Sequence, residues 1–347
     1  MKVLYIGPLW NGGTCLQRMK AMQDLGYEVI PVDAEPPLVL DKQRHFFYRV
    51  WRKLLYPPDL ANANQSIVCL IKEHTIDVLW LDKALTITPK TLKIVRERSP
   101  KTIIAGYSPD DMAAKHNQSR AFLSGLPVYH VYFTTKSYGV EELKYLGVPQ
   151  VFFVGNAYDP TTHRPVTLSE EGKKHYGGTV GFVGDYESER AQLMFYLAKC
   201  GIPIRIWGTN WERKCKLHHP NMMIEGKSLY GDDYAKAICA FDINLAFLRK
   251  INRDLQTQRS IEIPACGGFM LAERTNEHLE LFGEGREAEF FSTKEELLEK
   301  VRYYLDHEDE RKRIALAGRE RCLKSGYSYH ERIKEMFRVI DKLKSSL

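Results

Sequence analysis

The chain of 347 residues is long enough for two domains of ordinary size, each with its own hydrophobic core. Hydrophobic residues make up 44% of the chain and charged residues 27%, and these shares exclude disordered, collagenous and fibrous proteins. The 50 Lys and Arg residues exceed the 44 Asp and Glu residues, and the resulting formal charge of +6 permits an anionic partner without requiring one.

Membrane and secretory signals are missing from the sequence. No apolar run approaches the roughly 18–20 residues that a membrane-spanning helix needs, and the start MKVLYIGPLWNGG lacks the long apolar region of a signal peptide. Seven scattered cysteines, none in a CxxC spacing, argue against a disulfide framework or a zinc site. We therefore expect a cytoplasmic protein with reduced thiols and no bound metal.

Hydrophobic runs alternate with helical patterns in the first half of the chain, an order that is typical of a parallel sheet covered by helices. The expected strands are Val3–Ile6, Glu28–Val32, Val78–Leu81, Thr102–Ala105, His130–Phe133 and Val151–Val154. The expected helices are Thr14–Leu25, Ala61–His74, Pro89–Arg98 and Ser137–Leu146. The first half is thus predicted to be one doubly wound α/β domain.

The same alternation returns after the polar segment Asp159–Gly178, which contains two prolines and is predicted to be a connector. The expected strands are Thr179–Val183, Ile204–Trp207, Asp242–Leu245, Phe269–Ala272 and Ala288–Phe291. The expected helices are Glu189–Cys200, Asp233–Ala240, Asp254–Ala265 and Lys294–His307. The second half is therefore predicted to be a second doubly wound domain.

Both halves open with a strand, a glycine-containing loop, a helix, a glycine and another strand. Gly26 and Gly201 each fit the position just after a helix, where a left-handed backbone is needed. We predict an N-terminal domain of residues 1–158, a second domain of residues 159–326, and a helix in 327–347 that packs back on the first domain. Two such domains facing one another imply a cleft at the carboxyl ends of their strands, where an active site is expected.

The segment NRDLQTQRSIEIPACGGFMLAE, residues 252–273, is the most informative part of the sequence. A helix that begins at Asp254 would direct the free backbone amides of its first turn into the cleft, and such amides favour an anion. Arg253 and Arg259 would add guanidinium groups suited to a diphosphate. Glu262, on the same face, suits a ribose diol. The alternative is an ordinary capped helix with solvated arginines.

Several motifs together resemble a known family. RSIEIPACGGFMLAERTNEHLELFGEGREAEFF, KEELLEKVRYYL and RKRIALAGRERCLKSGYSYHERI resemble the donor domain of GT-B glycosyltransferases, most closely the group named after the spore-maturation protein CgeB. FVGDYESER, IRIWGTNW, YSPDDM and GNAYDP also fit that group, so the resemblance spans nearly the whole chain. It implies a GT-B fold of two Rossmann-like domains, with a nucleotide-sugar donor in the second domain and the acceptor in the first.

The resemblance also implies roles for single residues. Retaining GT-B enzymes carry two glutamates eight positions apart; Glu262 matches the second, whereas the shorter Asp254 stands in the first position. Arg190 is a candidate for an arginine on the donor phosphates, and the loop after Trp207 is expected to line the nucleobase pocket. Core packing for Trp207 and a plain tight turn for Gly184 are the alternatives. The expected donor-binding residues are Gly184, Trp207, Gly208, Trp211, Arg253, Asp254, Gln256, Thr257, Arg259 and Glu262.

In the first half, Asp110 and Asp111 follow a predicted strand, where either could deprotonate or hold an acceptor hydroxyl. With Arg190 they form the predicted catalytic set; a turn and helix cap is the alternative for the two aspartates. The further residues expected at the acceptor or in the cleft are Gly12, Gly13, Thr14 and Asn156.

The segment 41–58 carries Arg49, Arg52 and Lys53 among aromatic residues. These basic side chains are candidates for binding an anionic acceptor, such as nucleic acid, a glycan or a protein, or an anionic membrane surface. An amphipathic helix that packs its aromatic residues on the domain is the alternative.

The sequence therefore predicts a GT-B hexosyl- or pentosyltransferase that uses a nucleotide sugar, UDP-linked donors being the first candidates. No metal or other cofactor is expected, because helix amides and arginines would stabilise the leaving diphosphate. Two other classes stay open: a noncatalytic coat or scaffold protein that keeps the fold, and a nucleic-acid-binding protein, including a transferase that acts on modified DNA.

Overall fold

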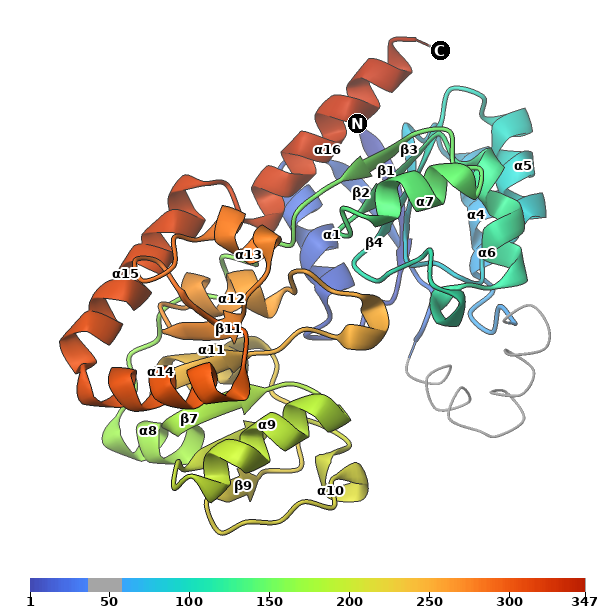
Figure 1. Cartoon of the computed structure of the whole chain (residues 1–347). Coiled ribbons are helices and arrows are strands. Elements are labelled where there is room, and N and C mark those ends of the chain that lie inside the picture. Colours follow the sequence, from blue (N-terminus) through green and yellow to red (C-terminus); the bar gives the residue numbers. More distant parts are fainter. Residues whose placement is uncertain (37–57, 347) are drawn as a thin grey trace. The chain divides into compact units, whose positions relative to one another are not determined.

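Each of two units of the chain is built around a parallel six-stranded sheet (Figure 1). The computed structural model describes residues 1–36 and 58–346. The first unit comprises Met1–Gly155 and Tyr329–Leu347, and the second comprises Asn156–Ser328. The division falls between Gly155 and Asn156, whereas the sequence analysis places it after residue 158.

The first sheet has the strand order β2-β1-β3-β4-β5-β6, with every neighbouring pair parallel. Its strands are β1 (Lys2–Gly7), β2 (Glu28–Asp33), β3 (Val78–Asp82), β4 (Ile103–Ser108), β5 (Val131–Thr134) and β6 (Val151–Phe153). Its helices are α1 (Thr14–Asp24), α4 (Ala63–Glu73), α5 (Pro89–Arg98), α6 (Arg120–Gly125), α7 (Gly139–Tyr145) and α16 (Tyr329–Lys344), with short 3₁₀ turns at Lys115–Asn117 and Leu126–Val128. The six strands and four helices predicted for this half are confirmed.

The two faces of the first sheet bury alternate residues of each strand, as a period of two requires. Leu79 and Leu81 of β3 belong to a core with residues of α4, α5 and α6. Trp80 between them stacks with Phe337 of α16, at 6.1 Å between ring centroids. Figure 1 shows α16 beside α1, which it contacts. The last helix of the chain therefore completes the first unit.

The second sheet has the order β12-β11-β10-β7-β8-β9 and is also parallel throughout. Its strands are β7 (Gly178–Val183), β8 (Ile204–Trp207), β9 (Met222–Ile224), β10 (Phe241–Ala246), β11 (Met270–Glu273) and β12 (Glu289–Phe291). Its helices are α8 (Glu170–Tyr176), α9 (Ser188–Lys199), α10 (Trp211–Lys214), α11 (Gly231–Ala240), α12 (Arg259–Ala265), α13 (Asn276–Leu281), α14 (Lys294–Asp306) and α15 (Glu308–Lys324), with a 3₁₀ turn at Lys250–Asn252.

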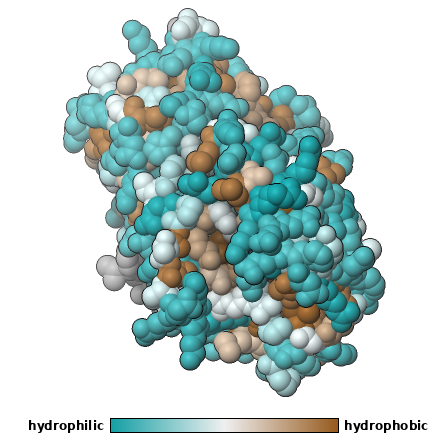
Figure 2. All heavy atoms as spheres, turned by 90° about the vertical axis from the view of Figure 1, so that its left-hand side faces the viewer, coloured by the Kyte–Doolittle hydropathy of each residue, from teal (hydrophilic) through white to brown (hydrophobic). Residues whose placement is uncertain are grey.

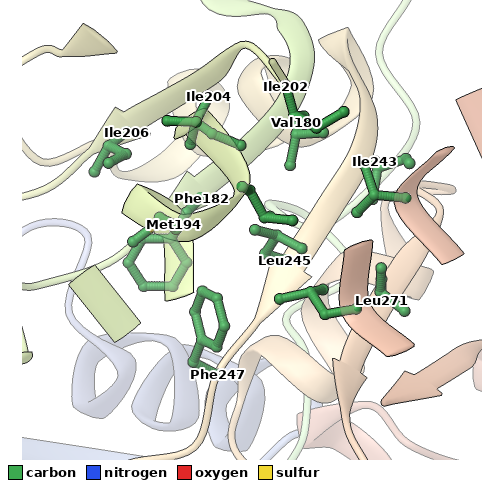
Figure 3. Close-up of a cluster of buried hydrophobic side chains, with 14 of the residues drawn as sticks. Val180, Phe182, Met194, Ile202, Ile204, Ile206, Ile243, Leu245, Phe247 and Leu271 are labelled. Carbon is green, nitrogen blue, oxygen red and sulfur yellow. The ribbon is translucent and has the colours of Figure 1, made fainter. Parts of the chain in front are cut away.

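The core of this unit also divides by strand face. Figure 3 shows side chains of β7, β8, β10 and β11, among them Phe182, Ile206 and Leu245, meeting Met194 of α9. The opposite face belongs to a second cluster, with residues of α11 and α12. Both sheets are thus covered by helices on both faces, and the predicted pair of doubly wound α/β units is confirmed.

Two local predictions for the second half are wrong. The expected connector contains α8, because Ser169 caps it by accepting a hydrogen bond from the Gly172 amide at 3.1 Å. The helix expected from Asp254 begins only at Arg259. The short strand β9 was not predicted at all. In contrast, Gly26 and Gly201 have φ angles of +84° and +88°, as expected at their helix ends.

The face of the molecule drawn in Figure 2 is mostly hydrophilic, and its hydrophobic atoms lie in small patches. In the described part of the chain, no helix combines the length and the apolar character that a membrane crossing requires.

A buried ion pair joins the sheet of the first unit to two helices. Arg18 of α1 donates two hydrogen bonds to Asp82 at the end of β3, at 2.7 and 2.8 Å, and both side chains are fully buried. Tyr5 of β1 donates to the same carboxylate at 2.5 Å, and Arg18 donates to the Tyr329 hydroxyl of α16 at 3.5 Å. Asp82 therefore depends on Arg18 for its only cationic neighbour within ion-pair distance among the described residues.

We expect the substitution Arg18→Met to lower the free energy of unfolding by about 3–5 kcal/mol, because Asp82 would remain buried without its cation. The double variant Arg18→Met/Asp82→Leu should recover much of this loss, because no charge is then buried. Urea unfolding followed by circular dichroism measures both. Lys334→Ala, which removes an exposed pair with Glu331, is the control and should change the free energy by less than about 0.5 kcal/mol. An equally small effect of Arg18→Met would contradict the role assigned to the pair.

Candidate functional site

The order of strands in the second sheet places a candidate site between β7 and β10. The chain proceeds from β7 to β8 on one side and later continues on the other side with β10, so the strand order reverses at this point. In open α/β sheets, ligands bind at the carboxyl ends of the strands at such a switch point. A pocket of about 580 Å³ lies there. It is lined by Asp185, Tyr186, Glu187, Ser188, Glu189, Arg190, Asn210, Lys214, Arg249, Lys250, Ile251 and Arg259.

The lining is rich in charge, with five basic and three acidic side chains. Glu187 pairs with Arg249 at 2.9 Å and with Arg190 at 3.2 Å, and Lys250 pairs with Glu273 at 2.7 Å. In contrast, no carboxylate of the described residues forms an ion pair with Arg259. The balance of the pocket is therefore cationic, which favours an anionic ligand.

Arg190, in the first turn of α9, is the most unusual of these groups. Its residue is only 2% exposed, and its guanidinium donates to the carbonyl oxygens of Asp185 at 3.0 Å and Leu248 at 3.3 Å. Its Nε has no hydrogen-bond partner. Burial and the neighbouring charge of Arg259 lower the pKa of Arg190 to about 10. A bound anion would relieve both unfavourable effects.

Arg259 reaches the pocket by crossing the end of β7. Its Nε donates to the Val183 carbonyl at 2.8 Å, and its guanidinium lies 5.7 Å from the centre of the Phe182 ring. A Cβ on Gly184 would lie 2.6 Å from an Arg259 nitrogen and 2.8 Å from Phe182. Gly184 thus leaves the space that the Arg259 side chain occupies, and its expected contact with the donor stays a prediction.

Gly208 allows a second close approach in the same region. A Cβ there would lie 1.9 Å from the Gly184 carbonyl oxygen, which also accepts a hydrogen bond from the Trp211 indole at 2.8 Å. The ends of β7 and β8 are therefore packed backbone against backbone behind the pocket.

Neither predicted tryptophan offers a surface to a ligand. Trp207 is 1% exposed and donates to the Tyr176 carbonyl at 3.2 Å, and Trp211 is fully buried. Both belong to hydrophobic clusters of the unit. The structure therefore favours core packing for both indoles, because both rings fill the interior beside the sheet. The expectation that the loop after Trp207 lines the nucleobase pocket stays a prediction.

The helix predicted to begin at Asp254, whose first turn was expected to bind an anion, begins later, at Arg259. Arg253 has a left-handed backbone, with φ +51°, so the chain turns back before any helix begins. The Asp254 amide donates to the Arg249 carbonyl at 3.2 Å, and the Thr257 amide donates to the Ser260 hydroxyl at 3.0 Å. These two amides are therefore satisfied within the protein.

Gln256 and Asn156 form a buried polar link. Both the backbone amide and the side-chain amide of Asn156 donate to Gln256 Oε1, at 3.3 and 3.1 Å. Gln256 in turn donates to Glu277 at 2.7 Å. The structure thus gives the two predicted residues a common role, which is to hold the loop before α12 against the start of the second unit.

Glu262 lies one turn after Arg259 on α12 and is 7% exposed. Its Oε2 accepts a hydrogen bond from the Tyr234 hydroxyl at 3.0 Å, and its Oε1 lies 3.6 Å from His163 Nε2. Residues three apart on a helix share a face, so the Glu262 carboxylate and the Arg259 guanidinium belong to one side of α12.

In the first unit, the two predicted aspartates have different surroundings. Asp111 is buried, and its side chain accepts a hydrogen bond from the Ala114 amide at 3.2 Å, so it caps a turn. Asp110 is paired with Lys83, which follows β3 and has a left-handed φ of +50°. Lys83 and Asp110 come from neighbouring strands, β3 and β4, at the carboxyl edge of the sheet.

The remaining predicted acceptor residues lie in two places. Gly12 has a φ of +88°, and Gly13 is the residue before α1, which begins at Thr14. The Gly13 amide donates to the Trp10 carbonyl at 3.0 Å, and a Cβ on Gly13 would meet the Trp10 ring at 2.9 Å. The three basic residues expected to bind an acceptor, Arg49, Arg52 and Lys53, lie outside the described residues, and their role stays a prediction.

Several pocket residues were not singled out from the sequence. Arg249 and Lys250 follow the predicted strand that became β10, so the rule applied to Asp110 and Asp111 could also have found them. Glu187 lies inside the motif FVGDYESER but was not considered by itself. His163 and Tyr234 carry no signal in the sequence, because only folding brings them to Glu262. Within residues 1–36 and 58–346, no group of three or more His, Cys, Asp or Glu side chains could hold a metal ion.

Comparisons with known proteins agree with this architecture. Residues 190–338 match a family model described as glycosyl transferase-like. A search of curated proteins finds no match.

Three solved structures have a similar fold. One is Anabaena HepE in complex with UDP-glucose (TM-score 0.65, 13% identity, 100% of each chain covered). Another is a glycosyltransferase from Rickettsia africae (TM-score 0.67, 13% identity, 98% of each chain covered). The third is sucrose-phosphate synthase from Thermosynechococcus elongatus (TM-score 0.66, 11% identity, 100% of each chain covered). The chain therefore has the predicted GT-B fold, and its residues 190–338 resemble a glycosyl transferase-like family.

We expect Gly208→Ala to lower the free energy of unfolding by about 1–3 kcal/mol, because the added methyl group would overlap the Gly184 carbonyl oxygen. Thermal and urea unfolding measure this loss. Gly178→Ala, at a site where the nearest heavy atom is 3.7 Å from the added Cβ, is the matched control on the same sheet. If both variants are equally stable, the ends of β7 and β8 are not packed as described.

Proposed function

We propose that this protein is a glycosyltransferase that takes its sugar from a nucleoside-diphosphate sugar bound in the second unit. The observation that carries the proposal is the pair of arginines at the switch point of the second sheet. Arg190 is buried with one unsatisfied N–H group, and Arg259 beside it has no carboxylate partner among the described residues. Two such guanidinium groups suit a diphosphate, which offers several charged acceptor oxygens.

The surrounding pocket supports the assignment of the phosphates to this place. Residues Glu187–Arg190 bring the start of the twelve-residue helix α9 to the pocket, so its backbone dipole adds to the positive potential. Arg249 and Lys250 are further cations that line the pocket, and they are already paired with Glu187 and Glu273. Arg190 shares Glu187 with Arg249 and keeps an unsatisfied Nε–H group, and Arg259 has no carboxylate partner among the described residues, so these two groups would gain from a bound diphosphate.

We propose that Glu262 accepts hydrogen bonds from the ribose of the donor, because it follows Arg259 on the same side of α12. UDP is the first nucleotide to test, since the similar Anabaena protein HepE has been solved with UDP-glucose. In the transfer, the bond between the anomeric carbon and the diphosphate breaks, and the acceptor oxygen forms a new bond to that carbon. The arginines stabilise the charge that the leaving diphosphate gains.

The acceptor is proposed to bind the first unit, at the carboxyl edge where Asp110 lies. Asp110, which pairs with Lys83, would there accept the proton that the acceptor hydroxyl releases. Asp111 is assigned a structural role, because its side chain caps a turn.

We expect Arg259→Ala to weaken binding of UDP and of UDP-glucose about 10- to 150-fold, because a charge-assisted hydrogen bond contributes about 1.5–3 kcal/mol. Isothermal titration calorimetry measures both affinities. Arg302→Ala, which removes an exposed arginine of α14 outside the pocket, is the matched control and should bind as the native protein does. Native affinity in Arg259→Ala would reject the phosphate site. Nucleotide binding without any turnover or hydrolysis of the donor would instead favour a noncatalytic protein of the same fold.

We also propose that transfer requires no metal ion, because cationic side chains and the α9 terminus would neutralise the diphosphate. Hydrolysis of UDP-glucose in excess EDTA should then proceed at the rate seen without EDTA. Assays with added Mg²⁺ and Mn²⁺ are the comparison. Activity that disappears in EDTA and returns with either metal would show that a metal ion takes part.

A further inference from the structure

A carboxylate that accepts a hydrogen bond from a tyrosine and faces a histidine lies beside the proposed phosphate site. Glu262 of α12 is buried, and each of its two oxygens faces a different side chain. The Tyr234 hydroxyl of α11 donates to Oε2 at 3.0 Å, and His163 Nε2 lies 3.6 Å from Oε1. All three residues belong to the second unit, but they come from three separate segments of it.

The hydrogen bond that His163 accepts shows which of its ring nitrogens carries the hydrogen. The Asp159 amide donates to His163 Nδ1 at 2.9 Å, so this nitrogen carries no hydrogen. A neutral imidazole then has its hydrogen on Nε2, the nitrogen directed at the carboxylate. The His163 ring also packs edge-on against Tyr234, at 5.5 Å between centroids and 82° between planes. The His163 and Tyr234 side chains therefore support each other beside Glu262.

Burial of the Glu262 carboxylate lowers the stability of the folded protein, so stability alone does not explain this arrangement. In the described part of the chain, no Lys or Arg forms an ion pair with Glu262, and a buried carboxylate without a cation is unfavourable. Burial and the charge of Glu262 raise the pKa of the Tyr234 hydroxyl, so the donor keeps its proton. An ionised carboxylate has about four lone-pair positions. The Tyr234 hydroxyl uses one of these positions on Oε2, His163 Nε2 faces Oε1 at 3.6 Å, and further positions remain for a ligand.

We propose that Tyr234 and His163 are positioning residues that fix the Glu262 carboxylate so that it accepts hydrogen bonds from both hydroxyls of the donor ribose. The pair would thereby determine how strongly the protein prefers ribonucleotides to 2′-deoxyribonucleotides. This inference rests on the proposed function, because it requires a nucleoside diphosphate at Arg190 and Arg259. A Glu262 carboxylate that is free to rotate would be less well aligned with the two hydroxyls of a ribose. A 2′-deoxyribose has only one of these hydroxyls, so its binding depends less on that alignment.

The test compares the affinities of UDP and 2′-deoxyuridine 5′-diphosphate by isothermal titration calorimetry. The native protein should bind UDP more tightly. Tyr234→Phe should reduce this preference about 2- to 10-fold, mainly through weaker UDP binding, because it removes one hydrogen bond to the carboxylate. His163→Ala should have a similar effect, and His163→Gln should restore part of the preference, since its amide N–H can replace the Nε2–H group.

Tyr304→Phe is the matched control. It also removes a hydrogen bond from a buried tyrosine to a buried glutamate, Tyr304 to Glu289 at 2.8 Å, in the same unit. We expect it to lower stability without changing the ratio of the two affinities. A merely structural role for Tyr234 and His163 would give the same result in their variants, and that result would overturn the inference.

The outcomes also separate the inference from the proposed function. If the native protein binds neither nucleotide, the proposed donor site fails and the inference fails with it. If the native protein binds UDP, loses affinity in Arg259→Ala, and keeps its ribose preference unchanged in Tyr234→Phe and His163→Ala, the donor site stands and only the inference is overturned.

Discussion

The hydrogen bond from Arg259 Nε to the Val183 carbonyl is the interaction on which the candidate site depends. It ties the start of α12 to the carboxyl end of β7 and holds a guanidinium group across the first residue after that strand. The space exists because Gly184 has no Cβ. Gly208 in turn allows the β8 end to lie directly behind Gly184. A short chain of backbone contacts thus fixes a charged group at the point where the strand order of the sheet reverses.

This placement leaves positive charge in the pocket that the carboxylates of the described residues offset only in part. Arg190 is buried with an unsatisfied N–H group, and its pKa is lowered to about 10 by burial and by Arg259. Glu187 offsets part of this charge for Arg190, but it is shared with Arg249. The remaining positive potential lies at the start of α9. A diphosphate matches this potential in charge, which is why we propose this pocket as the donor site.

Particular residues show how far the sequence could lead. Arg190, Arg259, Gly184 and Glu262 were identified from motifs and from the rule that ligands gather at strand ends, and the structure brings the first three together. The two tryptophans show the limit of the same rule: a residue at a strand end can point into the core, and the motif does not reveal the direction. The helix start predicted for residues 254–257 was wrong for another reason. A left-handed Arg253 and local hydrogen bonds delay the helix, and these tertiary and backbone effects override the hydrophobic pattern.

The sequence by itself determined the two doubly wound units, because hydrophobic periodicity and glycine positions are local properties that can be recognised within short segments of the chain. It also determined which residue types would supply positive charge. Only the tertiary structure decided which of those charges would be neutralised. Arg249 and Lys250 form ion pairs with carboxylates of other segments, whereas Arg259 forms none among the described residues. The order of residues in the sequence does not predict this difference. The contacts of Tyr234 and His163 with Glu262 have the same origin, since three segments distant in sequence meet only when the helices pack on the sheet.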